Sequence, residues 1–242
     1  MATYQNSPNY CPQCGFNLMF HNHQLNAAAV EKKWQDVKFI IIFYFLIFVT
    51  LASLRIYPPL KNSFLGEQIT EWMGLFITIL FLFLSRVDKK NIISKFNIFK
   101  STAIVILFLI LTLLVNTNYT KFLKLIFGIN NEENDLADKA IIFSIYFLVF
   151  YDCVMPAITE EIAFRLIIFE KFKNVVSLKE AVLLSSILFA ILHVKFYITP
   201  YYIFVGAILC WIRLYSKSLI PCIVLHFLHN LYITLIESQY FK

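Results

Sequence analysis

Seven blocks of apolar residues constrain what this chain can fold into. The blocks are about 16 to 28 residues long, enough for a helix to cross about 30 Å of hydrocarbon. Hydrophobic residues make up 60% of the 242-residue chain and charged residues only 15%, well below the quarter typical of soluble domains. The pattern therefore predicts an all-α polytopic membrane protein with about seven transmembrane helices, at residues 37–56, 69–85, 101–116, 143–170, 179–197, 199–215 and 219–236.

Charges between the blocks predict the orientation and the domains. Basic residues dominate the N-terminal flank and the 86–100, 171–180 and 213–218 connections, whereas the 117–140 loop is acidic. Because cytoplasmic loops carry an excess of Lys and Arg, the N-terminus is expected inside the cell and the C-terminus outside. The net charge of +6 is then explained by these loops, and no nucleic-acid partner is expected. A cleavable signal peptide is not expected, since the first 36 residues are polar and begin with no apolar core. We expect a cytoplasmic segment (1–36), three N-terminal helices (37–116) and a helical core (143–236).

Two adjacent glutamates and an arginine interrupt the fourth block, in Thr159-Glu160-Glu161-Ile162-Ala163-Phe164-Arg165. A charge at bilayer depth costs a few kcal/mol, so it rarely persists without a partner or a function. Glu161 and Arg165 are four residues apart with the acid first, the favourable order for an ion pair on one helix face. Glu160 points about 100° away from Glu161. We therefore predict that Arg165 neutralises Glu161 and that Glu160 faces a cavity.

Further polar residues lie in the later apolar blocks: His193, His226 and Asn230, with Asp152 and His229 interpreted as packing residues. At a rise of about 1.5 Å per residue, Glu160, His193, His226 and Asn230 reach overlapping depths. Pro156 could kink its helix and open space beside them. A glutamate in an apolar pocket can act as general base to water, a histidine can shuttle the proton, and an amide can stabilise an oxyanion. The same Glu/His/His set could instead ligate a divalent metal.

These residues form three motifs, EExxxR at 160–165, FxxxH from Phe189 to His193, and HxxxN from His226 to Asn230. In this order they resemble the CaaX protease and bacteriocin-processing (CPBP, or Abi) family of intramembrane proteases, over roughly residues 143–236. The resemblance implies an endopeptidase acting on a peptide or membrane-protein segment in the cell membrane. It implies that Glu160 and His193 activate water, that His226 and Asn230 stabilise the oxyanion, and that Glu161, Arg165 and Phe189 support them.

The resemblance leaves the metal and the substrate open. Family members are commonly labelled metalloproteases, so zinc could be a cofactor, yet a glutamate mechanism without metal is also argued for them. The abundance of Lys, Asn, Ile and Phe resembles a low-GC bacterium, for which a prenylated substrate is not expected. The spans carry no HExxH, GxSx or GxGD motif of other intramembrane proteases. The alternatives are a non-catalytic protein for bacteriocin immunity or scaffolding, and a proton-coupled transporter, which the lack of an internal repeat disfavours.

The N-terminal segment contains Cys11-Pro12-Gln13-Cys14-Gly15, which has the form of half a zinc ribbon. Such a turn presents two thiolates to one metal ion. His21 and His23 could complete a Cys2His2 set, although their spacing is shorter than the usual one. A second interpretation is a degenerate ribbon that no longer closes, or one that shares a metal between chains. Zinc at Cys11 and Cys14 is therefore a candidate structural site.

Overall fold

The computed structural model describes residues 18–56, 64–85, 98–128, 145–193 and 196–239. Within these ranges every regular element is a helix, and there is no strand. The helices form seven continuous rods, which confirms the predicted all-α class. Six rods are α1 (Leu18–Ile56), α2 (Phe64–Leu84), α3 (Ile98–Phe127), α8 (Leu178–Leu192), α9 (Thr199–Ser216) and α10 (Ile220–Gln239).

The remaining rod carries the acidic motif and is not a regular α-helix. It runs through α5 (Ile145–Leu148), α6 (Met155–Glu161) and α7 (Phe169–Phe172), with π-helical segments η2 (Val149–Val154) and η3 (Ile162–Ile168) between them. Pro156 stands at the start of α6, where η2 ends. Proline has no N–H, so the α-helical hydrogen bond to the carbonyl oxygen of Asp152 cannot form. Short π-helical turns are frequent at functional sites, and here they enclose Glu160 and Glu161 on both sides.

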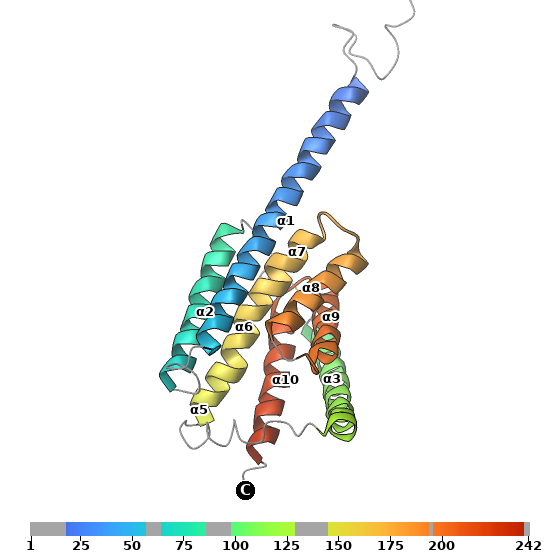
Figure 1. Cartoon of the computed structure of the whole chain (residues 1–242). Coiled ribbons are helices and arrows are strands. Elements are labelled where there is room, and N and C mark those ends of the chain that lie inside the picture. The colour runs from blue at the N-terminus through green and yellow to red at the C-terminus, as the bar shows by residue number, and fades with distance from the viewer. Residues whose placement is uncertain (1–17, 57–63, 86–97, 129–144, 194–195, 240–242) are drawn as a thin grey trace, which may run out of the picture.

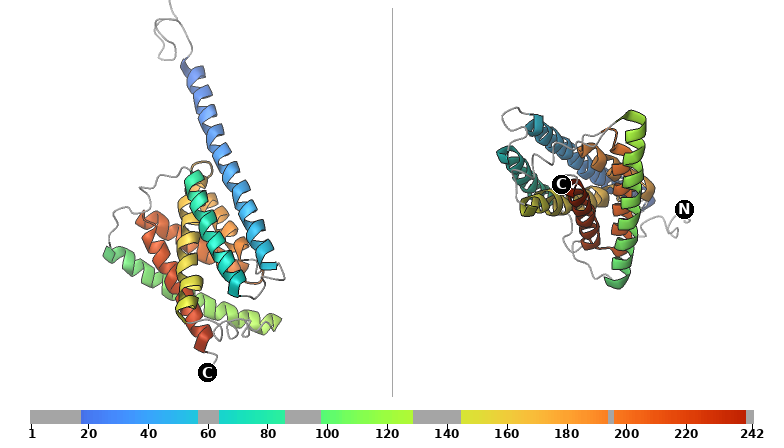
Figure 2. Two further views of the ribbon diagram at one scale, coloured as in Figure 1. Left: turned by 90° about the vertical axis from the view of Figure 1, so that its left-hand side faces the viewer. Right: turned by 90° about the horizontal axis from the view of Figure 1, so that it is seen from below.

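The rods are not all parallel (Figures 1 and 2). Helices α1, α2 and α6 lie side by side, whereas α3 runs crosswise to them and packs against α9 and α10. The N-terminal part of α1 extends beyond the other helices, which places the start of this helix well before the predicted residue 37. Where α1 meets the end of the fourth rod, the Lys171 ammonium lies 3.2 Å from the Asp36 carboxylate.

Two apolar clusters hold the rods together. One joins α1, α2, η3 and α8 around Phe81, Phe164 and Phe189. The other joins α3, α9 and α10 around Leu209 and Leu225. Between the clusters, α8 and α9 pack so closely that a Cβ atom on Gly206 would lie 3.0 Å from the Ser186 Cα. The polar residues of the three motifs lie where these two clusters meet.

Many large apolar side chains point outward from the bundle. On α3 they include Leu107, Leu114 and Leu125, all more than half exposed. Among the described residues, one helix (Ile98–Phe127) has the length and the apolar composition needed to cross a membrane. The seven predicted spans, their alternation and the cytoplasmic N-terminus remain predictions, because only this helix meets both criteria among the described residues.

Candidate active site

Glu161 and Arg165 form the predicted ion pair at the centre of the site. Arg165 Nη1 donates to Glu161 Oε1 at 2.9 Å, and both side chains are fully buried. Arg165 Nη2 also donates to the carbonyl oxygen of Gly206 at 3.3 Å. Its guanidinium lies 4.4 Å from the centroid of the Phe189 ring, a cation–π contact. The arginine is thus held by its own helix, by α9 and by α8.

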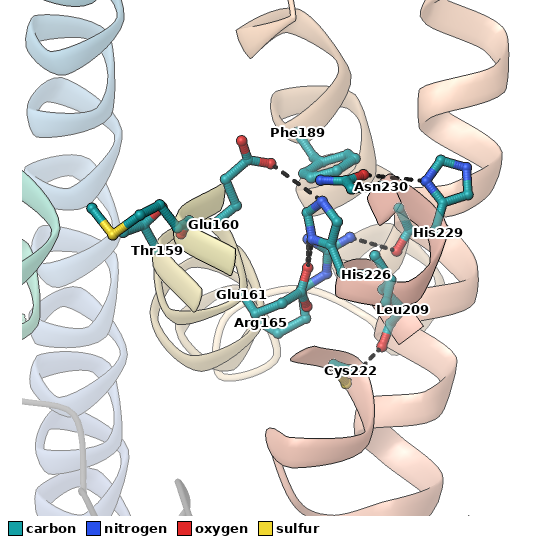
Figure 3. Close-up of polar contacts among 12 residues, drawn as sticks. Thr159, Glu160, Glu161, Arg165, Phe189, Leu209, Cys222, His226, His229 and Asn230 are labelled. Atoms are coloured by element: carbon teal, nitrogen blue, oxygen red, sulfur yellow. Dashed lines mark hydrogen bonds and ion pairs between the residues drawn. The ribbon is translucent and has the colours of Figure 1, made fainter. Parts of the chain in front are cut away.

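His226 joins the ion pair from α10 and stands between the two glutamates (Figure 3). Its Nδ1 lies 2.9 Å from Glu161 Oε1. A carboxylate oxygen only accepts, so Nδ1 carries the proton and, in a neutral ring, Nε2 has the lone pair. Nε2 points toward Glu160 and lies 4.0 Å from its Oε2 atom, beyond hydrogen-bonding distance. His226 therefore has one nitrogen committed to Glu161 and the other directed at Glu160.

Glu160 differs from its neighbour in exposure and in partners. Its side chain keeps 20% exposure, whereas that of Glu161 keeps none. Within the described part of the chain, the buried Glu160 Oε2 atom has no hydrogen-bond partner. The buried Glu161 Oε2 atom has no such partner either, so the two glutamates differ in exposure and in the bonds that Glu161 Oε1 makes to Arg165 and His226. The predicted division between a paired Glu161 and a separate Glu160 is present in the structure.

Phe189 is the centre around which the three motifs meet. Its ring contacts Phe164, His193 and His226 with centroid distances of 5.3, 4.9 and 5.8 Å. His193 ends α8, where its Nδ1 donates to the Phe189 carbonyl oxygen at 2.9 Å, which leaves Nε2 as the basic nitrogen of a neutral ring. The His193 ring also stacks on Tyr202, 3.8 Å between centroids. An aromatic residue one turn before His193 can therefore pack against the His193 ring, as Phe189 does.

Asn230 lies one helical turn after His226 and is fixed at both ends of its amide. Nδ2 donates to the carbonyl oxygen of Asp152 at 3.2 Å, and Oδ1 lies 3.3 Å from His229 Nδ1. The Asp152 carbonyl is the one that Pro156 leaves without its α-helical donor. Asn230 Nδ2 thus bonds the carbonyl oxygen to which Pro156 cannot donate, and this bond uses one of the two Nδ2 hydrogens.

Sequence reasoning missed four contributors to the site: Tyr202, Gly206, Tyr201 and Thr112. Tyr202 stacks on His193, and Gly206 supplies a carbonyl to Arg165. Tyr201 contacts His229 and the Thr112 carbonyl oxygen. Tyrosines at a helix start and a glycine in an apolar helix are too common to single out. The periodicity of one helix also carries no information on which residues of another helix it meets.

The predicted metal sites have different outcomes. Among the described residues, no group of three or more His, Cys, Asp and Glu side chains is arranged to hold a metal ion. The Cys11 and Cys14 half-site lies outside the described residues, and so do the side chains of His21 and His23. Zinc in the N-terminal segment therefore remains a prediction. The other three cysteines, Cys153, Cys210 and Cys222, are free and buried, as expected for packing residues.

The geometry is that of a buried carboxylate–histidine site assembled from three helices of an all-helical protein. The family model for type II CAAX prenyl endopeptidase Rce1-like proteins matches residues 142–232, a range that holds all three motifs. The predicted resemblance to the CPBP family is thereby confirmed for this region, and the family points to a membrane-embedded protease. No curated protein and no solved structure matches the chain.

Proposed function

We propose that the chain is a multi-pass intramembrane endopeptidase in which Glu160 activates the water that attacks the peptide bond. The supporting observation is the pair formed by Glu160 Oε2 and His226 Nε2, which lie 4.0 Å apart. If one water donates to both atoms with bonds of about 2.8 Å, the two acceptors make an angle of about 90° at its oxygen. This angle is close to the H–O–H angle of water. The site thus has the spacing for one water between the glutamate and the histidine.

The proposed reaction uses the motif residues in sequence. Glu160 takes a proton from the water, and the oxygen attacks the carbonyl carbon of the scissile bond. The spare hydrogen on Asn230 Nδ2 donates to the oxyanion that forms, while His226 Nε2 accepts from the hydrogen that remains on the attacking oxygen. His193 Nε2 is assigned the role of proton shuttle, as the family resemblance implies. The proton then passes to the leaving nitrogen as the C–N bond breaks, giving a carboxylate and an amine.

Glu161 and Arg165 support this reaction without taking part in it. A second free carboxylate beside Glu160 would raise the cost of ionising either one. The buried bond from Arg165 removes that conflict. Among the described residues, no group of three or more His, Cys, Asp and Glu side chains is placed to hold a metal ion, and the proposed steps use water alone.

Replacing Glu160 with glutamine tests the proposal. The change preserves size and removes the base, so cleavage should fall by about 10²-fold or more while the protein remains folded. The full-length protein in liposomes would be assayed with two quenched fluorescent peptides, one farnesylated with a CaaX terminus and one with an apolar segment of about 20 residues. Peptidomics of membranes from cells with either variant would widen the substrate range.

Glu180→Gln is the matched control, because Glu180 lies at the exposed start of α8 and glutamine can replace it in the helix cap. The control should cleave like the wild-type protein. Undiminished cleavage by Glu160→Gln would refute the role of Glu160. Identical membrane peptides from wild type and Glu160→Gln, with neither probe cut, would instead favour the non-catalytic alternative.

A further inference from the structure

A chain of buried polar contacts continues from Asn230 away from the two glutamates. His229 Nδ1 lies 3.3 Å from Asn230 Oδ1, and the other ring nitrogen, Nε2, makes a short hydrogen bond with the Tyr201 hydroxyl. That hydroxyl also lies 3.3 Å from the carbonyl oxygen of Thr112 on α3. His229, Tyr201 and Thr112 are 7%, 4% and 0% exposed. The contacts therefore link α10, α9 and α3 in a place that water hardly reaches.

The donors and acceptors in this chain admit one arrangement for a neutral histidine. Asn230 Nδ2 donates to the Asp152 carbonyl, which orients Oδ1 toward His229. An amide oxygen only accepts, so His229 must carry its proton on Nδ1. His229 Nε2 then has the lone pair, and the Tyr201 hydroxyl shares its one hydrogen between this nitrogen and the carbonyl oxygen of Thr112. Each group thus sets the orientation of the next, from Tyr201 through His229 to Asn230.

The other end of the amide is fixed by the backbone irregularity at Pro156. An alanine at this position would offer an N–H to the Asp152 carbonyl and compete with Asn230. With proline there, Asn230 Nδ2 makes the bond at 3.2 Å. The amide is held by an acceptor on one side and a donor on the other. Its second Nδ2 hydrogen is consequently held in a fixed direction.

We propose that His229 and Tyr201 are positioning residues that hold the Asn230 amide in the orientation needed to donate to the oxyanion. This inference rests on the proposed function and adds two residues that belong to none of the three motifs. It also gives α3, which lies outside residues 142–232, a role in the site through Thr112. The sequence context of His229 indicated a packing residue, whereas this proposal gives it a positioning role.

Kinetics of the full-length protein in liposomes, with whichever of the two fluorescent peptides is cleaved, test the proposal. His229→Leu removes the donor to Asn230 and should lower kcat by about 10- to 100-fold with KM nearly unchanged, since one oxyanion donor is worth about 10²–10³. His229→Asn should recover part of the loss, because its amide nitrogen can take the place of Nδ1. Tyr201→Phe should lower kcat less, and Pro156→Ala should also lower it.

Combination with Asn230→Ala separates positioning from a structural role. If His229 acts through Asn230, His229→Leu should cause no further loss in the Asn230→Ala background. The same fold loss in both backgrounds would overturn the proposal. Tyr119→Phe is the matched control, because the Tyr119 hydroxyl also bonds a backbone carbonyl, that of Tyr197, at 2.7 Å. It should keep the wild-type kcat.

Nitrogen NMR of the full-length protein with 15N-labelled histidine gives a second test that needs no substrate. The His229 signals, identified by their loss in His229→Asn, should show a protonated Nδ1 and an unprotonated Nε2. Tyr201→Phe and Asn230→Ala should each shift them. A proton on Nε2 in the neutral ring would overturn the proposed orientation. Absence of Glu160-dependent cleavage would remove the proposed function, whereas this spectrum would still decide whether His229 orients Asn230.

Discussion

Replacing Arg165 with methionine should cost more stability than most core substitutions, because it leaves a buried carboxylate without its cation. Arg165 donates to Glu161 at 2.9 Å and to Gly206 at 3.3 Å, and it contacts the Phe189 ring at 4.4 Å. A hydrogen bond to a charged group contributes about 1.5–3 kcal/mol, a neutral one about 1, and a desolvated cation–π contact about 2. These terms are not additive, and broken buried ion pairs typically cost about 3–5 kcal/mol, which is the expected loss.

The double variant Glu161→Gln/Arg165→Met supplies the control. It removes both charges, and the glutamine oxygen can still accept from His226 Nδ1. We expect it to be at least about 2 kcal/mol more stable than Arg165→Met alone, since the uncompensated charge is the main cost. Unfolding in mixed detergent micelles, followed by circular dichroism as the denaturing detergent is increased, measures both. A double variant less stable than the single one would refute this reasoning, as would a loss below about 1 kcal/mol for Arg165→Met.

Two further predictions concern helix packing and helix ends. Gly206→Ala should destabilise the protein by about 1–3 kcal/mol in the same unfolding assay, because the new Cβ meets Ser186 Cα at 3.0 Å. Gly74→Ala is its control, with nothing within 4 Å, and should be neutral or stabilising by about 0.5–1 kcal/mol. If both alanines behave alike, close packing is not the cause. Ser177→Ala should cost about 1 kcal/mol, since the hydroxyl caps α8. Hydrogen bonds from Ser177 lower the pKa of Glu180, so the stability they add is present above the ordinary glutamate pKa and is lost as pH falls through the lowered one. The difference between wild type and Ser177→Ala should therefore shrink in acid without vanishing, because the Ser177 hydroxyl also accepts the backbone N–H of Glu180. A constant difference down to that pH would contradict the assignment.

The sequence predicts those features of this protein that depend on one helix at a time. The apolar blocks give the seven rods, and the four-residue spacing gives the Glu161–Arg165 pair. Contacts between helices are harder to predict. The helical period shows which residues share a face of one helix, but it does not show which residues of another helix that face contacts. His226 and Glu161 are 65 positions apart, and no local pattern relates them. The same reason hides the contact of Tyr201 with Thr112.

Helix ends and helix directions are also hard to predict from this sequence. The first helix begins at Leu18 although residues 18–36 are polar, because the part of a helix that extends beyond the bundle needs no apolar face. The third helix reaches Phe127, past the polar stretch at 116–118. There the Asn118 side chain bonds the carbonyl of Leu114 at 2.7 Å, within its own helix. Loop charges predict on which side of the membrane a loop lies. They carry no information on helix tilt, and α3 runs crosswise to its neighbours (Figure 2).

The two adjacent glutamates of the motif have different roles in the proposed site. Glu161 accepts from Arg165 and from His226 Nδ1, and it thereby fixes the proton of His226 on that nitrogen. Only then does His226 present a lone pair on Nε2 toward Glu160. Two neighbours orient the Asn230 amide in the same way. His229 donates to its Oδ1 atom, and the carbonyl oxygen of Asp152 accepts from its Nδ2 atom. In each case a buried neighbour sets the direction of a proton or a lone pair. A hydrolytic site inside an apolar bundle depends on such fixed directions, because little water is present to reorient around a misplaced group.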